Sequence, residues 1–197
     1  MQYRFGDIWK HWPKEVVVVT TNIGWKQSGE NVMGAGLAAD AAKMIPELPL
    51  WYGSVCQSYG EDTPTIYHPK HRIVLFPTKA LNAEFPHMSW KSNSDLGLIW
   101  RSTAQLAALC FDSVVAVPIV GCQNGGLSPE FVLPVMKKFL THPRFFLVAK
   151  PSTAPFVEGI IGGSWGQHRV LDDPRPSSNP PHAPLGSYTV DNNGNLT

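Results

Sequence analysis

The hydrophobic positions of this chain fall into short continuous runs that alternate with amphipathic stretches. Four runs are rich in β-branched or aromatic residues and are bounded by turn-forming residues, which predicts strands at Val16–Thr21, Ile73–Phe76, Val114–Pro118 and Phe145–Ala149. A further edge strand is expected at Gln2–Phe5. Runs that are apolar throughout are typical of strands buried on both faces, as in a parallel or mixed sheet covered by helices.

Helical periodicity occupies the segments between these runs. Helices are predicted at Leu37–Met44, Leu50–Tyr59, Ser94–Cys110 and Pro129–Leu140. The last of these follows Ser128, a favourable N-cap residue, and has proline at its first position. The alternation of strands and helices predicts an α/β protein, a three-layer α/β/α sandwich with a mixed central sheet.

The character of the sequence changes after Lys150. Residues 151–197 are rich in proline, carry few charges and contain no long periodic run. We therefore expect one domain over residues 1–150 and a proline-rich C-terminal extension over residues 151–197 that can dock on it. Within this extension, residues 186–197 could close a small hairpin around Asn193-Gly194.

Composition narrows the class of protein. The chain has 197 residues, 43% of them hydrophobic and 16% charged, which is enough for one well-buried domain with an appendage. The net charge of +1 excludes a broad basic field, so a nucleic acid would have to be recognised locally. Cys56, Cys110 and Cys122 are widely spaced, which argues against a disulfide framework or zinc site and fits a reducing, cytoplasmic setting.

Other classes of partner are not expected either. No apolar run approaches the roughly eighteen residues that a bilayer crossing needs, and the N-terminus lacks the apolar core of a signal peptide, so no membrane partner is predicted. His68 and His71 have a metal-like spacing, but no third ligand follows them, and a solvated loop is the preferred interpretation. We therefore predict neither a metal nor a cofactor.

Two glycine-rich stretches each precede a predicted helix. The first reads NVMGAGLAAD at Asn31–Asp40, and the second reads GCQNGGLSPE at Gly121–Glu130. Neither matches the glycine patterns of P-loops or of dinucleotide-binding turns. Each could be a tight turn with nothing bound, or a cradle of backbone N–H groups for a phosphate at a helix N-terminus. Two such loops at the carboxyl ends of strands in one sheet could hold a diphosphate from both sides.

Several motifs, in this order along the chain, resemble those of macro domains, the ADP-ribose-binding fold. They are GDI at Gly6–Ile8, a buried strand ending in Asn22, MGAGLA at Met33–Ala38 and PIVGCQNGGL at Pro118–Leu127. FPTK at Phe76–Lys79 and WKSNS at Trp90–Ser94 are similar to elements of one branch. That branch contains the DNA ADP-ribosyl glycohydrolases of the DarG antitoxin type and the related terminal ADP-ribose protein glycohydrolases. The resemblance covers roughly residues 1–150.

The resemblance implies which residues bind the ligand. Asp7 would accept a hydrogen bond from the adenine amino group, Asn22 would contact the distal ribose, and the two glycine loops would enclose the diphosphate. The implied binding set is Asp7, Ile8, Asn22, Met33, Gly34, Ala35, Gly36, Leu37, Pro118, Gly121, Cys122, Gln123, Asn124, Gly125, Gly126 and Leu127. From the residues alone, Asp7 could equally cap a turn and Asn22 could terminate a strand.

Lys79 is the catalytic residue that the resemblance implies. In the resembling glycohydrolases, the lysine of this element acts at the anomeric carbon of the distal ribose. Breaking a glycosidic bond develops positive charge at that carbon. A lysine can attack it as a neutral amine if its pKa is depressed, or can protonate the leaving group if it is not. The alternative is a surface lysine at the end of a strand.

The sequence departs from this branch in two ways. The second loop has Asn124-Gly125-Gly126 and no aspartate, as in the DNA-directed proteins, and residues 80–89 lengthen the connection after Lys79. Glu84 and His87 in this insertion are weaker candidates for an acid or base. Trp25 and Trp90 are candidates for stacking on a base.

The predicted function is removal of ADP-ribose from a modified target, first of all ADP-ribosylated DNA. The alternative is a module or decoy that binds ADP-ribose or a related nucleotide without turnover. The implied partners are the ADP-ribosylated substrate, single-stranded DNA and an ADP-ribosyltransferase toxin.

Overall fold

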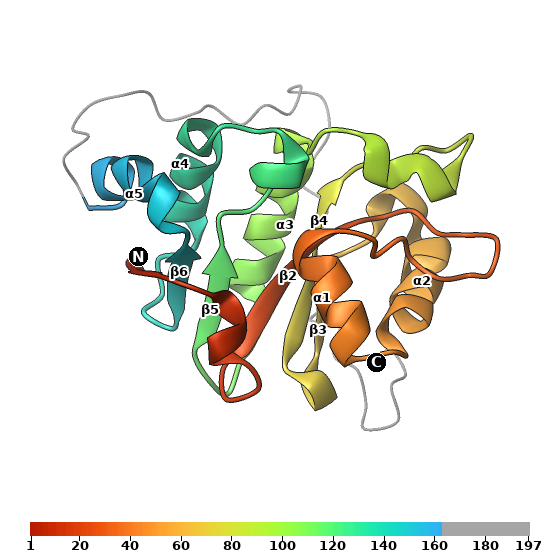
Figure 1. Ribbon diagram of the computed structural model, residues 1–197, viewed down its shortest axis with the longest axis horizontal. Helices are drawn as coiled ribbons and strands as arrows, with labels where there is room; N and C mark the ends of the chain where they lie inside the picture. Colours follow the sequence, from red (N-terminus) through yellow and green to blue (C-terminus); the bar gives the residue numbers. More distant parts are fainter. Residues whose placement is uncertain (163–197) are drawn as a thin grey trace.

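The structure, a computed structural model, describes residues 1–162, which form a mixed sheet between two layers of helices (Figure 1). Within these residues the sheet has six strands in the order β1-β6-β5-β2-β4-β3. Their bounds are β1 (Gln2–Phe5), β2 (Val16–Asn22), β3 (Ile66–His68), β4 (Ile73–Lys79), β5 (Val115–Pro118) and β6 (Phe145–Ala149). All neighbouring pairs are parallel except β3 and β4, which are antiparallel.

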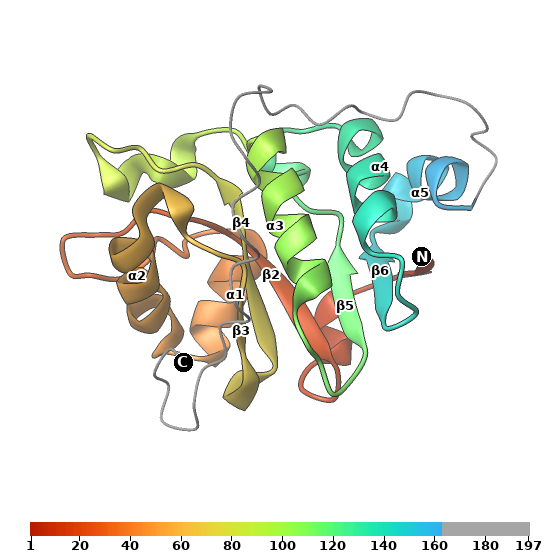
Figure 2. The same cartoon turned by 180° about the vertical axis from the view of Figure 1, so that it is seen from behind.

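Helices cover both faces of the sheet. They are α1 (Gly36–Met44), α2 (Leu48–Tyr59), α3 (Leu96–Ala108), α4 (Pro129–Phe139) and α5 (Ala154–Ile160). Helices α1 and α2 lie on one face, and α3, α4 and α5 lie on the other (Figures 1 and 2). The predicted three-layer sandwich with a mixed sheet is confirmed.

The alternation of side chains along β2 divides the interior into two cores. Val16 and Val18 pack on the side of α3 and α4, whereas Val17 and Val19 pack on the side of α1 and α2. All four are fully buried, as expected for a central strand whose successive side chains point to opposite faces.

Capping side chains determine where two helices begin. Ser128 is the N-cap of α4, as predicted, and its hydroxyl accepts a hydrogen bond from the Glu130 N–H at 3.4 Å. Helix α3 begins at Leu96, two residues later than the Ser94 that periodicity predicts, because the Asp95 carboxylate caps it by accepting from the Leu98 N–H at 2.6 Å.

One predicted strand extends well past its expected end, and one observed strand was not predicted. Strand β4 continues past Phe76 to Lys79, because Pro77 and Lys79 pair with Thr21 and Asn22 of β2. Strand β3 was not predicted, and it has only three residues, which is too short for an alternating pattern to stand out.

Part of the chain after Lys150, within residues 151–162, packs into the core. Val157 of α5 is fully buried against α4, and the ammonium of Lys137 donates to the Ile160 carbonyl at 2.7 Å. The division of the chain at residue 150 stays a prediction. The expected hairpin around Asn193-Gly194 lies outside the described residues.

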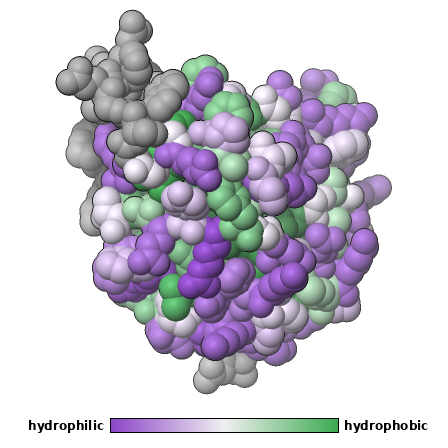
Figure 3. Space-filling view, turned by 60° about the vertical axis from the view of Figure 1, so that its left-hand side comes forward, coloured by the Kyte–Doolittle hydropathy of each residue, from purple (hydrophilic) through white to green (hydrophobic). Residues whose placement is uncertain are grey.

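The surface is mixed in polarity. On the side that Figure 3 shows, hydrophilic residues predominate, and apolar residues lie between them singly or in small groups. Among residues 1–162, no helix combines the length and the hydrophobicity that crossing a bilayer requires.

The burial of Phe145 predicts a large contribution to stability. Its side chain is 2% exposed on β6, whereas Phe131 on α4 is 51% exposed. We expect Phe145→Ala to lower the free energy of unfolding by about 3–5 kcal/mol, and the matched control Phe131→Ala to change it by less than about 1 kcal/mol. Urea denaturation followed by circular dichroism measures both, and equal effects would contradict this assignment of the core.

Candidate functional site

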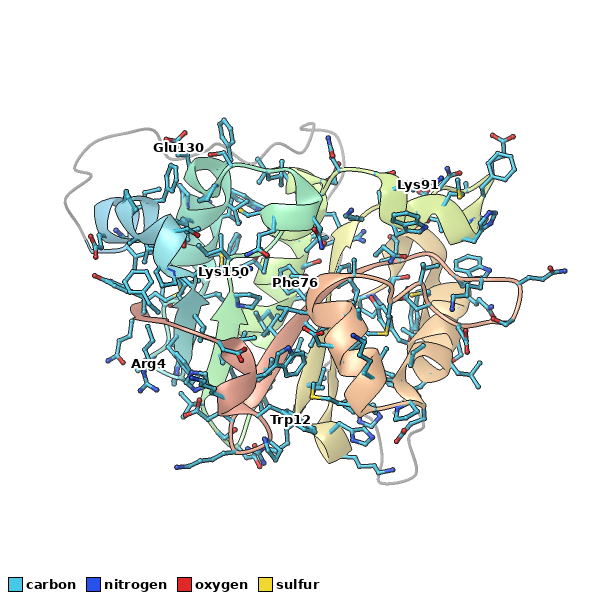
Figure 4. The ribbon with its side chains drawn as sticks, in the orientation of Figure 1. Arg4, Trp12, Phe76, Lys91, Glu130 and Lys150 are labelled. Atoms are coloured by element: carbon cyan, nitrogen blue, oxygen red, sulfur yellow. The ribbon has the colours of Figure 1, made fainter. Side chains whose placement is uncertain are left out.

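The carboxyl ends of four strands border a cavity of about 1160 Å³. Its lining includes Asn22 of β2, Lys79 of β4, Pro118 of β5 and Ala149 of β6. The lining residues Lys150 and Lys91 lie well apart along this edge (Figure 4). Such an edge is the usual place for a ligand in an open α/β sheet, because loops that leave adjacent parallel strands converge there.

The first glycine loop opens into this cavity at the start of α1. Gly34, Ala35 and Gly36 are exposed and belong to the lining. Ala35 is the N-cap residue, and it offers no side chain to accept hydrogen bonds from the first turn of the helix. The N–H groups of this turn, together with the positive end of the helix dipole, are therefore available to an anion in the cavity.

The second glycine loop lines the opposite side through Gly121, Cys122, Gln123 and Asn124. Gly121 has φ +70°, and a Cβ at this position would overlap the side chain of Ile99. Glycine is therefore required both by the backbone conformation and by the close packing on α3. The ammonium of Lys150, which follows β6, donates to the Gln123 side-chain oxygen at 3.2 Å and ties the loop to the next strand.

The two loops meet across the cavity. Gly36 has φ +56°, and a Cβ built on it would lie 3.2 Å from Nδ2 of Asn124. The two glycine loops therefore line the same cavity, and they follow β2 and β5, which are adjacent strands of one sheet. Donors from both sides can reach one anionic group held between them.

Most of the predicted site residues come together in this cavity. The lining contains Asp7, Ile8, Asn22, Gly34, Ala35, Gly36, Leu37, Lys79, Pro118, Gly121, Cys122, Gln123 and Asn124. Four predicted binding residues lie outside it: Met33, Gly125, Gly126 and Leu127. Met33 is buried in the core beneath α1, and Gly125 packs closely against Ser94, so these two support the loops from behind.

Other residues of the lining were not predicted. They are Gly6, Trp9, Thr20, Thr21, Val32, Ala38, Asp40, Thr78, Lys91, Ile119, Val148, Ala149, Lys150 and Thr153. Several of them lie next to predicted residues at strand ends, and this position in the sequence could have identified them as lining residues. No sequence signal pairs Trp9 with Asp40. These residues are 31 positions apart, and the hydrogen bond of 3.2 Å from Trp9 Nε1 to Asp40 Oδ2 forms only in the folded chain.

Asp7 and Asn22 both make structural hydrogen bonds at the edge of the cavity. Asp7 Oδ1 accepts from the Trp9 N–H at 3.0 Å and caps the 3-10 helix η1 (Ile8–His11), while the carboxylate remains exposed. The Asn22 side chain is 6% exposed; its Nδ2 donates to the Val32 carbonyl at 2.8 Å, and its Oδ1 accepts from the Gly24 N–H at 2.9 Å. Asn22 therefore joins both ends of the loop that leads to α1.

Lys79 ends β4 at one side of the cavity. Its backbone pairs with Asn22, and its ammonium donates to the Trp90 carbonyl at 2.7 Å. Partial burial lowers the pKa of Lys79, because the charged form loses hydration. Trp90 and Lys91 complete the lining on this side, whereas Glu84 and His87 lie outside it.

Cys122 lines the cavity but lacks the environment of a nucleophile. Its side chain is 8% exposed, and burial raises the pKa of the thiol to about 12. Among residues 1–162, no three His, Cys, Asp or Glu side chains come together in a way that could hold a metal ion.

These environments predict how the three thiols react. Cys110 is exposed, whereas Cys56 and Cys122 are buried, and the pKa of each buried thiol is about 12. At pH 7.5 a maleimide should label one thiol per native molecule, and Cys110→Ser should abolish fast labelling. Mass spectrometry of the labelled protein measures this, and fast labelling of Cys122 would contradict the assigned packing role.

Neither protein-family models nor curated proteins match this chain. Solved structures do. The macrodomain of Mycobacterium tuberculosis DarG is 29% identical, with a TM-score of 0.55, covering 76% of this chain and 97% of that chain. The macrodomain of Thermus aquaticus DarG is 20% identical, with a TM-score of 0.56, and the alignment covers 76% of this chain and 96% of that chain.

A third match is Thermosipho africanus DarTG in complex with ADP-ribose. It is 22% identical, with a TM-score of 0.58, and the alignment covers 76% of this chain but only 42% of that longer chain. The sheet order, the two glycine loops and these matches lead to one assignment. The described part of the chain has the macrodomain fold, similar to that of the DarG macrodomains.

Proposed function

We propose that this macrodomain binds ADP-ribose in the cavity at the carboxyl ends of its strands and releases it from an ADP-ribosylated target. The observation that carries the proposal is that both glycine loops and Lys79 line one cavity. The ADP-ribose bound by the Thermosipho protein supports the choice of ligand.

The order of the strands matches the order of groups in an elongated nucleotide. Strands β6, β5, β2 and β4 follow one another, and at about 4.8 Å for each neighbouring pair they span about 14 Å. Asp7 lies at the β6 side, where its free carboxylate oxygen suits the adenine amino group. The glycine loops lie in the middle, and Lys79 lies at the β4 side, where the distal ribose would be.

The middle of the cavity suits a diphosphate. Backbone N–H groups from the start of α1 and from Gly121–Asn124 can approach the phosphate oxygens closely, because the glycines of both loops carry no side chain. The lining also carries three cationic side chains, Lys79, Lys91 and Lys150, against two carboxylates. This balance favours an anionic ligand.

Lys79 supplies the chemistry in this proposal. Because partial burial lowers its pKa, a larger fraction of Lys79 is a neutral amine at a given pH than for an exposed lysine. A neutral amine can attack the anomeric carbon while the glycosidic bond to the target breaks and the target leaves; water then hydrolyses the new lysine–ribose bond and frees ADP-ribose and the amine. This route gains rate as pH rises through the lowered pKa. The ammonium can instead protonate the leaving group, and that route loses rate over the same range.

DNA is the target that the surroundings of Lys79 favour. Trp90 is 45% exposed beside the cavity, and the Lys91 ammonium lies 5.6 Å from the centre of its ring. An exposed aromatic ring next to a cation suits a nucleobase and its phosphate in single-stranded DNA. The partner that installs the modification would be an ADP-ribosyltransferase toxin, and the reaction would occur in the cytoplasm.

Two observations favour a second candidate, a module that binds ADP-ribose without turnover. The ammonium of Lys79 already donates to the Trp90 carbonyl, and the second loop offers no carboxylate as a partner. Substrate turnover decides between the two candidates.

Lys79→Ala should separate binding from chemistry. With a thymidine-ADP-ribosylated oligonucleotide, the wild type should release free ADP-ribose, and Lys79→Ala should release it at least about 100-fold more slowly, while the Kd for ADP-ribose changes less than about threefold. Chromatography of the products and calorimetry measure these quantities. Lys43→Ala, at an exposed position in α1, is the matched control and should keep full activity.

Two results would point elsewhere. Tight binding of ADP-ribose without release by the wild type would support the binding module. Unchanged release by Lys79→Ala would exclude the lysine mechanism.

A further inference from the structure

The segment 80–91, which contains the insertion of residues 80–89 and the first two residues of WKSNS, forms a compact turn of its own. The fully buried hydroxyl of Ser89 accepts from the Asn82 N–H at 2.9 Å and donates to the Pro86 carbonyl at 2.8 Å. The Phe85 N–H donates to the Asn82 side chain at 2.9 Å. Ser89 is therefore the internal link that closes this turn, which ends in the 3-10 helix η4 (Pro86–Lys91).

The turn packs directly against the backbone of the chain that follows β2. A Cβ built on Gly24 would overlap the Pro86 carbonyl and would lie 2.5 Å from Oγ and 2.7 Å from Cβ of Ser89. No larger residue fits at this position unless the turn moves. In Figures 1 and 2 the turn projects beyond the end of β4 and lies beside the loop between β2 and α1.

These contacts, together with the strand pairing, connect the backbone of Lys79 to the hydrogen-bond acceptor of its own ammonium. The backbone of Lys79 pairs with Asn22, and the Asn22 side chain accepts from the Gly24 N–H. Gly24 then packs against Ser89. The residue after Ser89 is Trp90, whose carbonyl accepts the hydrogen bond from the Lys79 ammonium.

This connection fixes both ends of a flexible side chain. A lysine has four rotatable carbon–carbon bonds, and an unrestrained one samples many positions for its Nζ. Here β4 fixes the Cα of Lys79, while the turn fixes the acceptor of its Nζ at 2.7 Å. The same turn contributes Trp90 and Lys91 to the cavity lining on the side of Lys79.

We propose that the turn at residues 80–91 is a positioning element for Lys79, and that Gly24 and Ser89 hold this turn in place. The link to catalysis rests on the proposed function, whereas the positioning of the amine does not. Gly24 and Ser89 lie outside the cavity lining and act only through the turn.

Two variants test the proposal by different physical routes. Gly24→Ala displaces the turn by overlap with the Pro86 carbonyl, whereas Ser89→Ala removes two hydrogen bonds without adding an atom. Ser58→Ala is the matched control, because it removes one hydroxyl bond to a carbonyl on the exposed face of α2. All three are compared with the wild type in the full chain.

The direct measurement is an NMR titration of the Lys79 side chain without ligand. In the wild type, burial holds the pKa of Lys79 below that of an exposed lysine. When the turn is displaced, water reaches the amine, and the pKa should rise towards its ordinary value in Gly24→Ala and Ser89→Ala but not in Ser58→Ala. An identical Lys79 titration in all four proteins would overturn the proposal.

Kinetics give the second readout. We expect both turn variants to lower kcat for ADP-ribose release by about tenfold or more and to change the Kd for ADP-ribose by less than about threefold. An equal loss of ADP-ribose binding would overturn the proposal, since it would mean general damage to the site. If the wild type released no ADP-ribose, the proposed function would fail, while the NMR titration would still test the positioning of Lys79.

Discussion

The parallel pairing of β2 with β5 on one side and β4 on the other is the constraint on which the site depends. It brings three chain segments that are far apart in sequence to one edge of the sheet: the loop into α1, the loop into α4, and Lys79. Each segment alone has an ordinary explanation, because glycine turns and strand-end lysines are common. Their convergence on one cavity supports the proposal that they bind one ligand.

Close packing explains the residue types at this edge. Gly121 is limited by Ile99 of α3, and a Cβ on Gly36 would crowd the Asn124 side chain across the cavity, so the loops leave little room for side chains at those points. The same limitation leaves backbone N–H groups as the groups that a ligand meets first. Lys79 is different, because its position depends on a hydrogen bond to a turn that must itself be held against Gly24.

The elements that the sequence predicts well are those with local causes. A run of buried β-branched residues locates β2, a run of buried aromatic and aliphatic residues locates β6, and Ser128 with Pro129 locates the start of α4. The short strand β3 and the helix α5 were not predicted, because three and seven residues are too few to show a clear hydrophobic period. Their burial depends on residues that are distant in the sequence. In the site, the motifs locate the glycine loops and Lys79, but the bond between Trp9 and Asp40 and the packing of Ser89 on Gly24 arise only in three dimensions.

The central claim is that the two glycine loops hold one ligand between them. An NMR titration with ADP-ribose tests it most directly through the backbone amides of residues 34–38 and 121–124. The account predicts that both sets shift together, with a single Kd, and that residues of the control helix α2 do not. Shifts confined to one loop, or two sets with different affinities, would contradict it.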